Sequence, residues 1–233
     1  MKIDDVIVKT EVSPKIHALV IGHTGATGGA LLDTLIASPN CDSIIAIGRR
    51  KSNRHAESPK LTQYVLPNML DISSLDPEIV KGSNAAFCCI GTTFNDVFKS
   101  SKAEEYKSVD YGIATEFSRF AKQSGVNFFG IITGDRSDSK SSHRMTRVKG
   151  ETEDFVLSQG FDRVAILRPG LLNRGNGRRG WLEQIFTVGG IFGIHVSVLA
   201  VSLYWTALNQ TDTAIKYETK DIKIAIQECQ KRA

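Results

Sequence analysis

Three glycines spaced every third residue could bind a phosphate. Gly22, Gly25 and Gly28 follow the apolar run at 16–21. Gly22 would let the chain leave a strand at backbone angles that a Cβ resists, and Gly25 would let a pyrophosphate approach the backbone. Gly28 would let the next helix pack close to a sheet. Free N–H groups and the positive end of a helix dipole favour an anion, so no lysine is needed in the loop itself.

A basic run, Arg49-Arg50-Lys51, is the second group that could do chemistry. At this distance from a glycine motif, an acidic residue favours a free ribose 2′-hydroxyl and an arginine favours a 2′-phosphate. Guanidinium groups bind phosphate through paired, charge-assisted hydrogen bonds. We therefore predict NADP(H) as the cofactor in preference to NAD(H). The alternative is a solvated basic loop.

The elements that must position these groups alternate along the chain. The glycine motif lies between two apolar strands, 16–21 and 43–48, with an amphipathic helix after Gly28. This strand–helix–strand unit is the context that the motif requires. Apolar runs predict four further strands, and three- and four-residue spacing predicts two further helices. The strands are expected at 61–66, 85–90, 127–132 and 163–168, and the helices at 106–120 and 145–158.

This alternation predicts an α/β fold with a doubly wound parallel sheet and helices on both faces. Ligands of such sheets lie beyond the carboxyl ends of the strands. Asp71-Ile72 falls where an edge of the adenine would lie, although Asp71 could instead cap a helix. The loop at 135–144 is long enough to cover a site, or its charges could simply be solvated.

The composition fits one domain. The chain has 233 residues, of which 41% are hydrophobic. We expect an N-terminal arm at 1–14 and a single dinucleotide-binding domain at 15–233. Within it, 171–233 is expected to form a flap and helices on the sheet edge that face substrate or a partner. The net charge of +4 is spread over several loops, so nucleic acid is not expected as a partner.

The four cysteines show no metal-ligand spacing, and no metal site is predicted. Cys88-Cys89 lies inside an apolar run, which indicates reduced, buried thiols. The sequence begins with acidic residues that a targeting peptide would avoid, and no uncharged apolar stretch is long enough to span a bilayer. We expect an intracellular protein without a transmembrane helix, in the cytoplasm, with the nucleus and an organelle surface as alternatives.

Five motifs in order resemble those of the atypical short-chain dehydrogenase/reductases, most of all the Tat-interactive-protein oxidoreductase group. The resemblance spans about residues 16–170, and the set is more specific than any one motif. The motifs are Gly22-x-x-Gly25-x-x-Gly28, Gly48-Arg49-Arg50, Phe87-Cys88-Cys89-x-Gly91-Thr92-Thr93, Val148-Lys149-Gly150-Glu151 and Arg168-Pro169-Gly170.

The resemblance implies a Rossmann fold that binds NADPH, with a serine after the fifth strand and a Tyr-x-x-x-Lys pair on the next helix. In that chemistry the tyrosine is the general acid, and the lysine lowers its pKa and holds the nicotinamide ribose. Lys149 matches the lysine, but Met145 stands at the tyrosine position and Thr133-Gly134 where the family has Ser-Ser. A thioether cannot donate a proton, and positioned acid catalysis is worth about 10²- to 10⁴-fold in rate.

Two functions therefore remain. The chain could be a cofactor-binding regulator or scaffold with a degraded site and a protein partner, or an active NADPH-dependent reductase of a small carbonyl substrate with a non-standard proton donor. The substrate and the oligomeric state stay open. The residues expected at the cofactor are Gly22, Thr24, Gly25, Ala26, Thr27, Gly28, Arg49, Arg50, Asp71, Ile72, Ile90, Gly91, Thr92, Ile132, Thr133, Lys149, Pro169 and Gly170.

Overall fold

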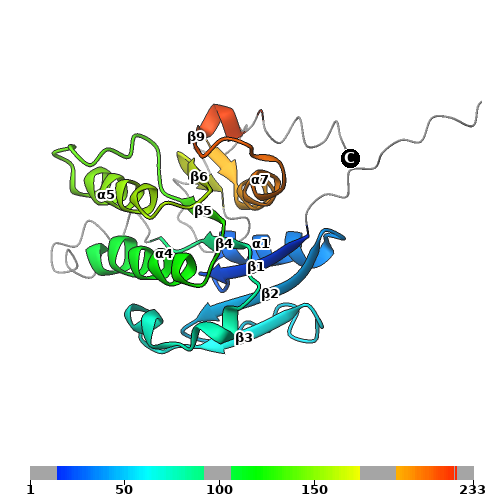
Figure 1. Ribbon diagram of the computed structural model, residues 1–233. Coiled ribbons are helices and arrows are strands. Elements are labelled where there is room, and N and C mark those ends of the chain that lie inside the picture. Colours follow the sequence, from blue (N-terminus) through cyan, green and yellow to red (C-terminus); the bar gives the residue numbers. More distant parts are fainter. Residues whose placement is uncertain (1–14, 92–105, 174–192, 223, 225–233) are drawn as a thin grey trace, which may run out of the picture.

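Seven parallel strands form the sheet that positions the glycine motif. The computed structural model describes residues 15–91, 106–173, 193–222 and 224 (Figure 1). The strand order is β3-β2-β1-β4-β5-β6-β9. The strands of the sheet are β1 (Ile16–Ile21), β2 (Cys41–Gly48), β3 (Leu61–Val65), β4 (Ala85–Cys88), β5 (Phe128–Ile132), β6 (Arg163–Arg168) and β9 (Ala214–Glu218). The expected doubly wound α/β fold is confirmed.

The order of the strands reverses at β1, which pairs with β2 on one side and with β4 on the other. All six residues of β1 are buried or half-buried. Such continuous apolar strands are typical of a parallel sheet that is covered on both faces. The carboxyl ends of β1 and β4 therefore mark the switch point at which ligands of such sheets bind.

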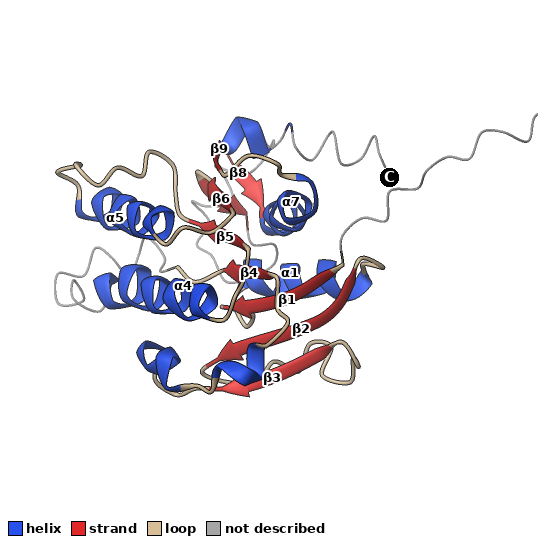
Figure 2. Cartoon of the chain, in the orientation of Figure 1, coloured by secondary structure: helices blue, strands red, loops and turns tan. Residues whose placement is uncertain are grey.

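Helices cover the two faces in separate layers (Figure 2). α1 (Ala26–Ala37) and α7 (Val196–Asn209) pack on one face, where Leu32, Leu35 and Leu203 are fully buried. α4 (Ala114–Gln123) and α5 (Arg144–Ser158) pack on the other, in a second core cluster. A π-helix (Ser108–Ile113) precedes α4, and short 3-10 segments at Met69–Ser74 and Pro77–Val80 join β3 to β4.

The C-terminal part contains strands as well as the expected helix. β9 adds a seventh strand beside β6, and β7 (Leu171–Asn173) pairs with β8 (Gly193–His195) in a separate two-stranded sheet. The sequence predicted a flap and helices here, and no strand. β9 was missed because it is an edge strand of half-exposed residues without the apolar run of the inner strands. The arm at 1–14 and the segment 174–192 lie outside the described residues.

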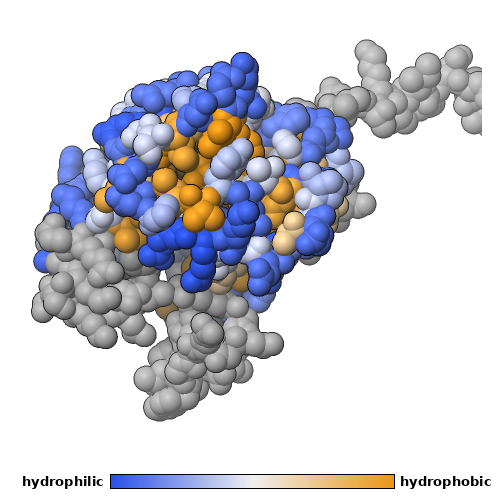
Figure 3. All heavy atoms as spheres, turned by 90° about the horizontal axis from the view of Figure 1, so that it is seen from below, coloured by the Kyte–Doolittle hydropathy of each residue, from blue (hydrophilic) through white to orange (hydrophobic). Residues whose placement is uncertain are grey.

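Figure 3 views the molecule from the side of β3 and shows an apolar area between hydrophilic residues. Val65 on β3 and Leu70 in the next 3-10 segment are among the exposed large hydrophobic side chains. Of the pair predicted to be buried, Cys88 is buried and Cys89 is half-buried, and Cys41 is buried as well. Burial raises the pKa of Cys41 to about 11 and that of Cys88 to about 12. In the described residues, no helix is both long and apolar enough to cross a membrane.

Hydrogen bonds hold the loop after β5 against α5. The Asp138 N–H donates to the Thr146 carbonyl at 3.1 Å, and the Arg147 guanidinium donates to the Ser141 carbonyl at 3.0 Å. The loop approaches the helix most closely at Gly150, where a Cβ would lie 2.1 Å from the Ser139 nitrogen. The loop can therefore pack this closely on α5 only because the residue in the second turn of the helix is a glycine.

We expect Gly150→Ala to destabilise the fold by about 1–3 kcal/mol, because the new methyl group would meet backbone atoms that cannot move aside freely. Gly170→Ala is the matched control, since its Cβ would be 3.5 Å from the nearest atom, an ordinary contact. Urea unfolding of both variants measures the effect. A Gly150→Ala variant as stable as the wild type would contradict this packing.

Candidate functional site

The glycine motif forms a tight turn with no room for side chains. Gly22 has a φ of +78°, and its carbonyl accepts the Gly25 N–H at 2.9 Å. A Cβ on Gly28 would lie 2.2 Å from that same carbonyl oxygen, and a Cβ on Gly22 would lie 2.6 Å from the Cys89 carbonyl carbon. These positions therefore accept only glycine.

The start of α1 is open to an anion. Gly25 is the N-cap residue, no side chain caps the helix, and its first turn holds no acidic residue. Thr24, Gly25 and Ala26 are exposed, and Thr27 is half-buried. The first N–H groups of a helix need an external partner, and the helix dipole favours a negative one. The turn can thus receive a phosphate.

The basic residues after β2 face solvent. Arg49 and Arg50 are exposed, and neither forms an ion pair with another described residue. Sequence reasoning missed Arg54, whose guanidinium lies over α1, 3.3 Å from where a Cβ on Gly29 would be, and pairs with Asp33 at 2.6 Å. Residue spacing in the polar loop could not have predicted the position of Arg54, because the path of the loop in the folded protein brings this side chain over α1.

His23, inside the glycine motif, is buried. Its side chain is 1% exposed, and neither ring nitrogen has a hydrogen-bond partner in the described part of the chain. A Cβ on Gly48 would lie 2.6 Å from the His23 Cε1 atom, so the ring fills the space beside the end of β2. Burial lowers the pKa of His23, and nearby polar groups only partly offset this.

Asp71 does not cap a helix. Asn68 accepts the Leu70 N–H at 3.2 Å and is the capping residue. Asp71 is exposed, and its carboxylate accepts the Asn68 side-chain amide at 2.9 Å. Ile72 is fully buried in the core. Asp71 lies at a kink inside this segment, and the cap alternative is wrong because its carboxylate is bonded to the Asn68 side-chain amide and not to a following backbone N–H. A role of Asp71 and Ile72 at the adenine stays a prediction.

Lys149 is held by a carboxylate. Its Nζ lies 2.8 Å from Asp110 Oδ1, and the two side chains are 15% and 3% exposed. The Asp110 oxygen is 3.9 Å from where a Cβ on Gly91 would lie, and the Lys149 stem is 3.2 Å from such a Cβ on Gly134. The ion pair therefore lies between the π-helix and α5, beside the residues that follow β4 and β5.

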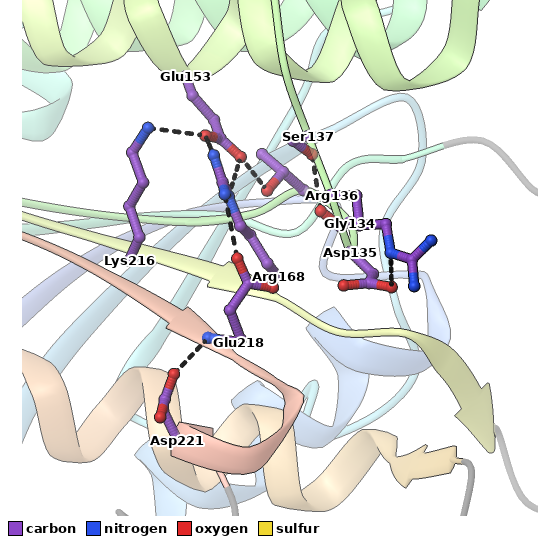
Figure 4. A network of polar contacts seen from close by, with 10 residues as sticks. Gly134, Asp135, Arg136, Ser137, Glu153, Arg168, Lys216, Glu218 and Asp221 are labelled. Carbon is purple, nitrogen blue, oxygen red and sulfur yellow. Dashed lines mark hydrogen bonds and ion pairs between the residues drawn. The ribbon is translucent and has the colours of Figure 1, made fainter. Parts of the chain in front are cut away.

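The Thr133 hydroxyl belongs to a buried polar network around Glu153. Figure 4 shows Arg168, Lys216 and Glu218 in this network. Its hydroxyl donates to Glu153 Oε1 at 2.7 Å, and the Arg168 Nε donates to the same oxygen at 3.0 Å. Arg168 also reaches the second Glu153 oxygen and pairs with Glu218 at 3.0 Å, while Lys216 Nζ lies 3.3 Å from Glu153. Hydrogen bonds to Glu153 raise the pKa of Arg168. The hydroxyl proton of Thr133 is thus used in the hydrogen bond to Glu153.

A phenol lies beside Met145 but faces its backbone. The Tyr106 hydroxyl donates to the Met145 carbonyl at 3.1 Å, and Tyr106 is 2% exposed. Burial, with the charge of Asp110, raises its pKa. A buried phenol with a raised pKa is a weaker acid than a free one, and this hydroxyl donates to a backbone carbonyl.

The structure brings most predicted site residues to one edge of the sheet, the carboxyl ends of the strands. The glycine motif follows β1, Arg49 and Arg50 follow β2, and Ile90 and Gly91 come just after β4. Ile132 and Thr133 end β5, and Pro169 and Gly170 follow β6, where the Gly170 N–H is bonded to Thr219. Thr92 lies outside the described residues. Whether these residues bind a cofactor stays a prediction.

Comparisons with known proteins identify related sequences and solved structures with a similar fold. No family model matches the chain. It is 31% identical over 186 residues to the protein fmp52, mitochondrial, of Emericella nidulans, covering 78% of each chain. It is 30% identical over 172 residues to HTATIP2 of Rattus norvegicus, covering 72% of this chain and 68% of that protein. MoeE5, solved with UDP-glucose and NAD, superposes with a TM-score of 0.68 at 15% identity over 92% of this chain and 82% of its own.

We expect the protein to lose stability as the pH falls below 6.5, the usual pKa of histidine. Unfolded His23 then binds a proton that the folded protein binds less readily, so the free energy of unfolding decreases towards acid. His23→Asn should make this dependence shallower in urea unfolding between about pH 5 and 7.5. The exposed His143→Asn should not. Equal slopes for wild type and His23→Asn would contradict the burial of a neutral ring.

Tyr106→Phe should cost about 1 kcal/mol of stability, because one hydrogen bond to a backbone carbonyl is lost. It should leave NADPH affinity and any NADPH oxidation unchanged. A fall in oxidation of about 10²-fold or more would instead identify Tyr106 as a proton donor.

Proposed function

Because this chain belongs to the atypical short-chain dehydrogenase/reductases, in the group that contains HTATIP2 and the fmp52 proteins, we propose that it binds NADP(H) and acts as a cofactor-dependent regulator or scaffold with little or no reductase turnover. One combination of features supports this proposal. The glycine turn that would hold a dinucleotide is intact, whereas methionine stands at the position that the resemblance assigns to the general acid.

The residues present fit a dinucleotide. The open first turn of α1 would receive the pyrophosphate through its N–H groups, next to glycines where a Cβ would fill the space. MoeE5 was solved with NAD, which supports a nicotinamide dinucleotide here. The choice of NADP(H) rests on Arg49 and Arg50, two exposed guanidinium groups after β2 that would bind the 2′-phosphate.

The nicotinamide end of the proposed site offers positioning without acid chemistry. Asp110 takes one of the three N–H groups of Lys149, which leaves two for a ribose hydroxyl pair. The Thr133 hydroxyl donates to Glu153 and would have to leave it to orient a carbonyl. When bound, the cofactor would supply hydride chemistry, but these side chains supply no ready proton for the product oxygen.

The second candidate is an active NADPH-dependent reductase of a small carbonyl compound. It is favoured by the retained Lys149 and by a hydroxyl at position 133. Its proton would come from water or from the substrate. NADPH oxidation with a panel of aldehydes and ketones separates the two functions: robust turnover of any of them would overturn the proposed regulator.

We propose a protein partner for the regulatory role, recognised when the cofactor is bound. We also propose an intracellular location, either cytoplasmic or at an organelle surface. The fungal relative is named as mitochondrial, so the outer surface of that organelle is one such place. Fractionation of cells that express the tagged protein distinguishes these locations.

Calorimetric titration with NADPH and NADH tests the cofactor site. Wild-type protein should prefer NADPH, and Arg49→Ala should weaken NADPH about 10- to 100-fold with a smaller effect on NADH, because a charged hydrogen bond is worth about 1.5–3 kcal/mol. Lys81→Ala, a substitution at an exposed lysine before β4 and thus at the opposite end of the sheet, is the control. Equal losses for both nucleotides would overturn the assignment of Arg49.

Met145→Tyr should restore part of the missing acid chemistry, since the phenol would lie one turn before Lys149 on α5. We expect measurable NADPH oxidation that Met145→Phe, the matched aromatic control, does not show. If Met145→Tyr binds NADPH and remains inactive with every carbonyl tested, the methionine is not what limits turnover.

A further inference from the structure

His23 holds a polar ring where the fold alone would favour an apolar one. It is 1% exposed, and neither nitrogen is hydrogen-bonded to a described residue. Leaving a buried donor or acceptor unpaired costs about 1–3 kcal/mol, and such groups in native structures call for an explanation. The ring lies within the motif that would bind the cofactor, so the explanation should involve that site.

The ring connects the glycine motif with the basic turn. It packs on Gly48, at the end of β2, so closely that a Cβ there would be 2.6 Å from Cε1. No described group forms a hydrogen bond of ordinary geometry with a ring nitrogen, but the backbone of Ile47 and of Arg50 and the side chain of Gln63 lie close enough to favour the protonated form. Gln63 in turn bonds the Ser52 N–H at 2.7 Å and the Ser52 carbonyl at 3.0 Å. His23 thus lies under the turn that carries Arg49 and Arg50.

The charges around His23 depend on what the turn binds. The polar groups next to the ring on β2 and β3 are uncharged, Arg49 and Arg50 are cationic, and Arg54 over α1 is paired with Asp33. Without a ligand, burial opposes a positive charge on the ring. A phosphate dianion bound at the arginines would oppose this effect, because a nearby negative charge favours the protonated imidazole.

Resting on the proposed NADP(H) site, we propose that His23 is a positioning residue that takes up a proton from solvent when a 2′-phosphate dianion binds at the Arg49–Arg50 turn. The imidazolium then has two N–H groups for the carbonyl oxygens of Ile47 and Arg50 and holds the turn against the glycine motif. NADH brings no dianion to this turn and causes no uptake. Selection of NADPH over NADH therefore strengthens as the pH falls from about 7.5 towards 6, below which the phosphate itself is protonated.

Calorimetry at about pH 6.5 in two buffers of different ionisation enthalpy measures the protons exchanged on binding. We expect net uptake of a fraction of a proton with NADPH and none with NADH. The sign is diagnostic, because a phosphate bound by arginines releases protons. His23→Asn should abolish the uptake and reduce the preference for NADPH. His55→Gln, which removes a half-exposed imidazole paired with Asp33 at 2.7 Å, should retain both.

The outcomes separate this inference from the proposed function. If NADPH is preferred but no uptake occurs, or if His23→Asn leaves the uptake unchanged, the role of His23 is overturned and the NADP(H) site stands. If neither NADPH nor NADH binds, the proposed NADP(H) site and the role of His23 are both overturned. Should His23→Asn fail to fold, ¹⁵N spectra of histidine-labelled wild type decide: the His23 nitrogens must change from neutral to imidazolium positions with NADPH and not with NADH.

Discussion

The close approach of α1 to the end of β1 is the constraint on which the rest of the structure depends. A Cβ on Gly28 would lie 2.2 Å from the Gly22 carbonyl oxygen, which no side chain can tolerate. This contact aims the first turn of α1 at the crevice where the strand order reverses. It also brings His23 under the end of β2, so one close backbone approach sets both the glycine turn and the packing of His23 on Gly48.

A buried carboxylate organises the opposite end of the site. Glu153 is fully buried and bonded by Thr133, Arg168 and Lys216. These residues come from α5, the end of β5, β6 and the edge strand β9. Removing one partner of a buried ion pair is far more costly than the pair is stabilising, so the network fixes these elements in one arrangement. A threonine held in this way is better suited to support the fold than to orient a substrate.

The sequence carried enough information for the inner strands, the glycine turn and the helix faces, because continuous apolar runs and three-residue glycine spacing have few structural solutions. β9 was not predicted because an edge strand of exposed and half-buried residues lacks such a run. The partners of Thr133 and Lys149 were not predicted either. Glu153 and Asp110 reach them from 20 and 39 residues away, and only the packing of helices on the sheet brings them together.

The most direct test of this account is a crystal structure of the protein with NADP⁺. We predict the pyrophosphate on the first turn of α1, the 2′-phosphate at Arg49 and Arg50, and the nicotinamide ribose at Lys149. The Tyr106 hydroxyl should remain on the Met145 carbonyl, with no phenol near the nicotinamide. A cofactor bound elsewhere, or a Tyr106 hydroxyl turned towards the nicotinamide, would contradict a cofactor-binding protein that has lost its proton donor.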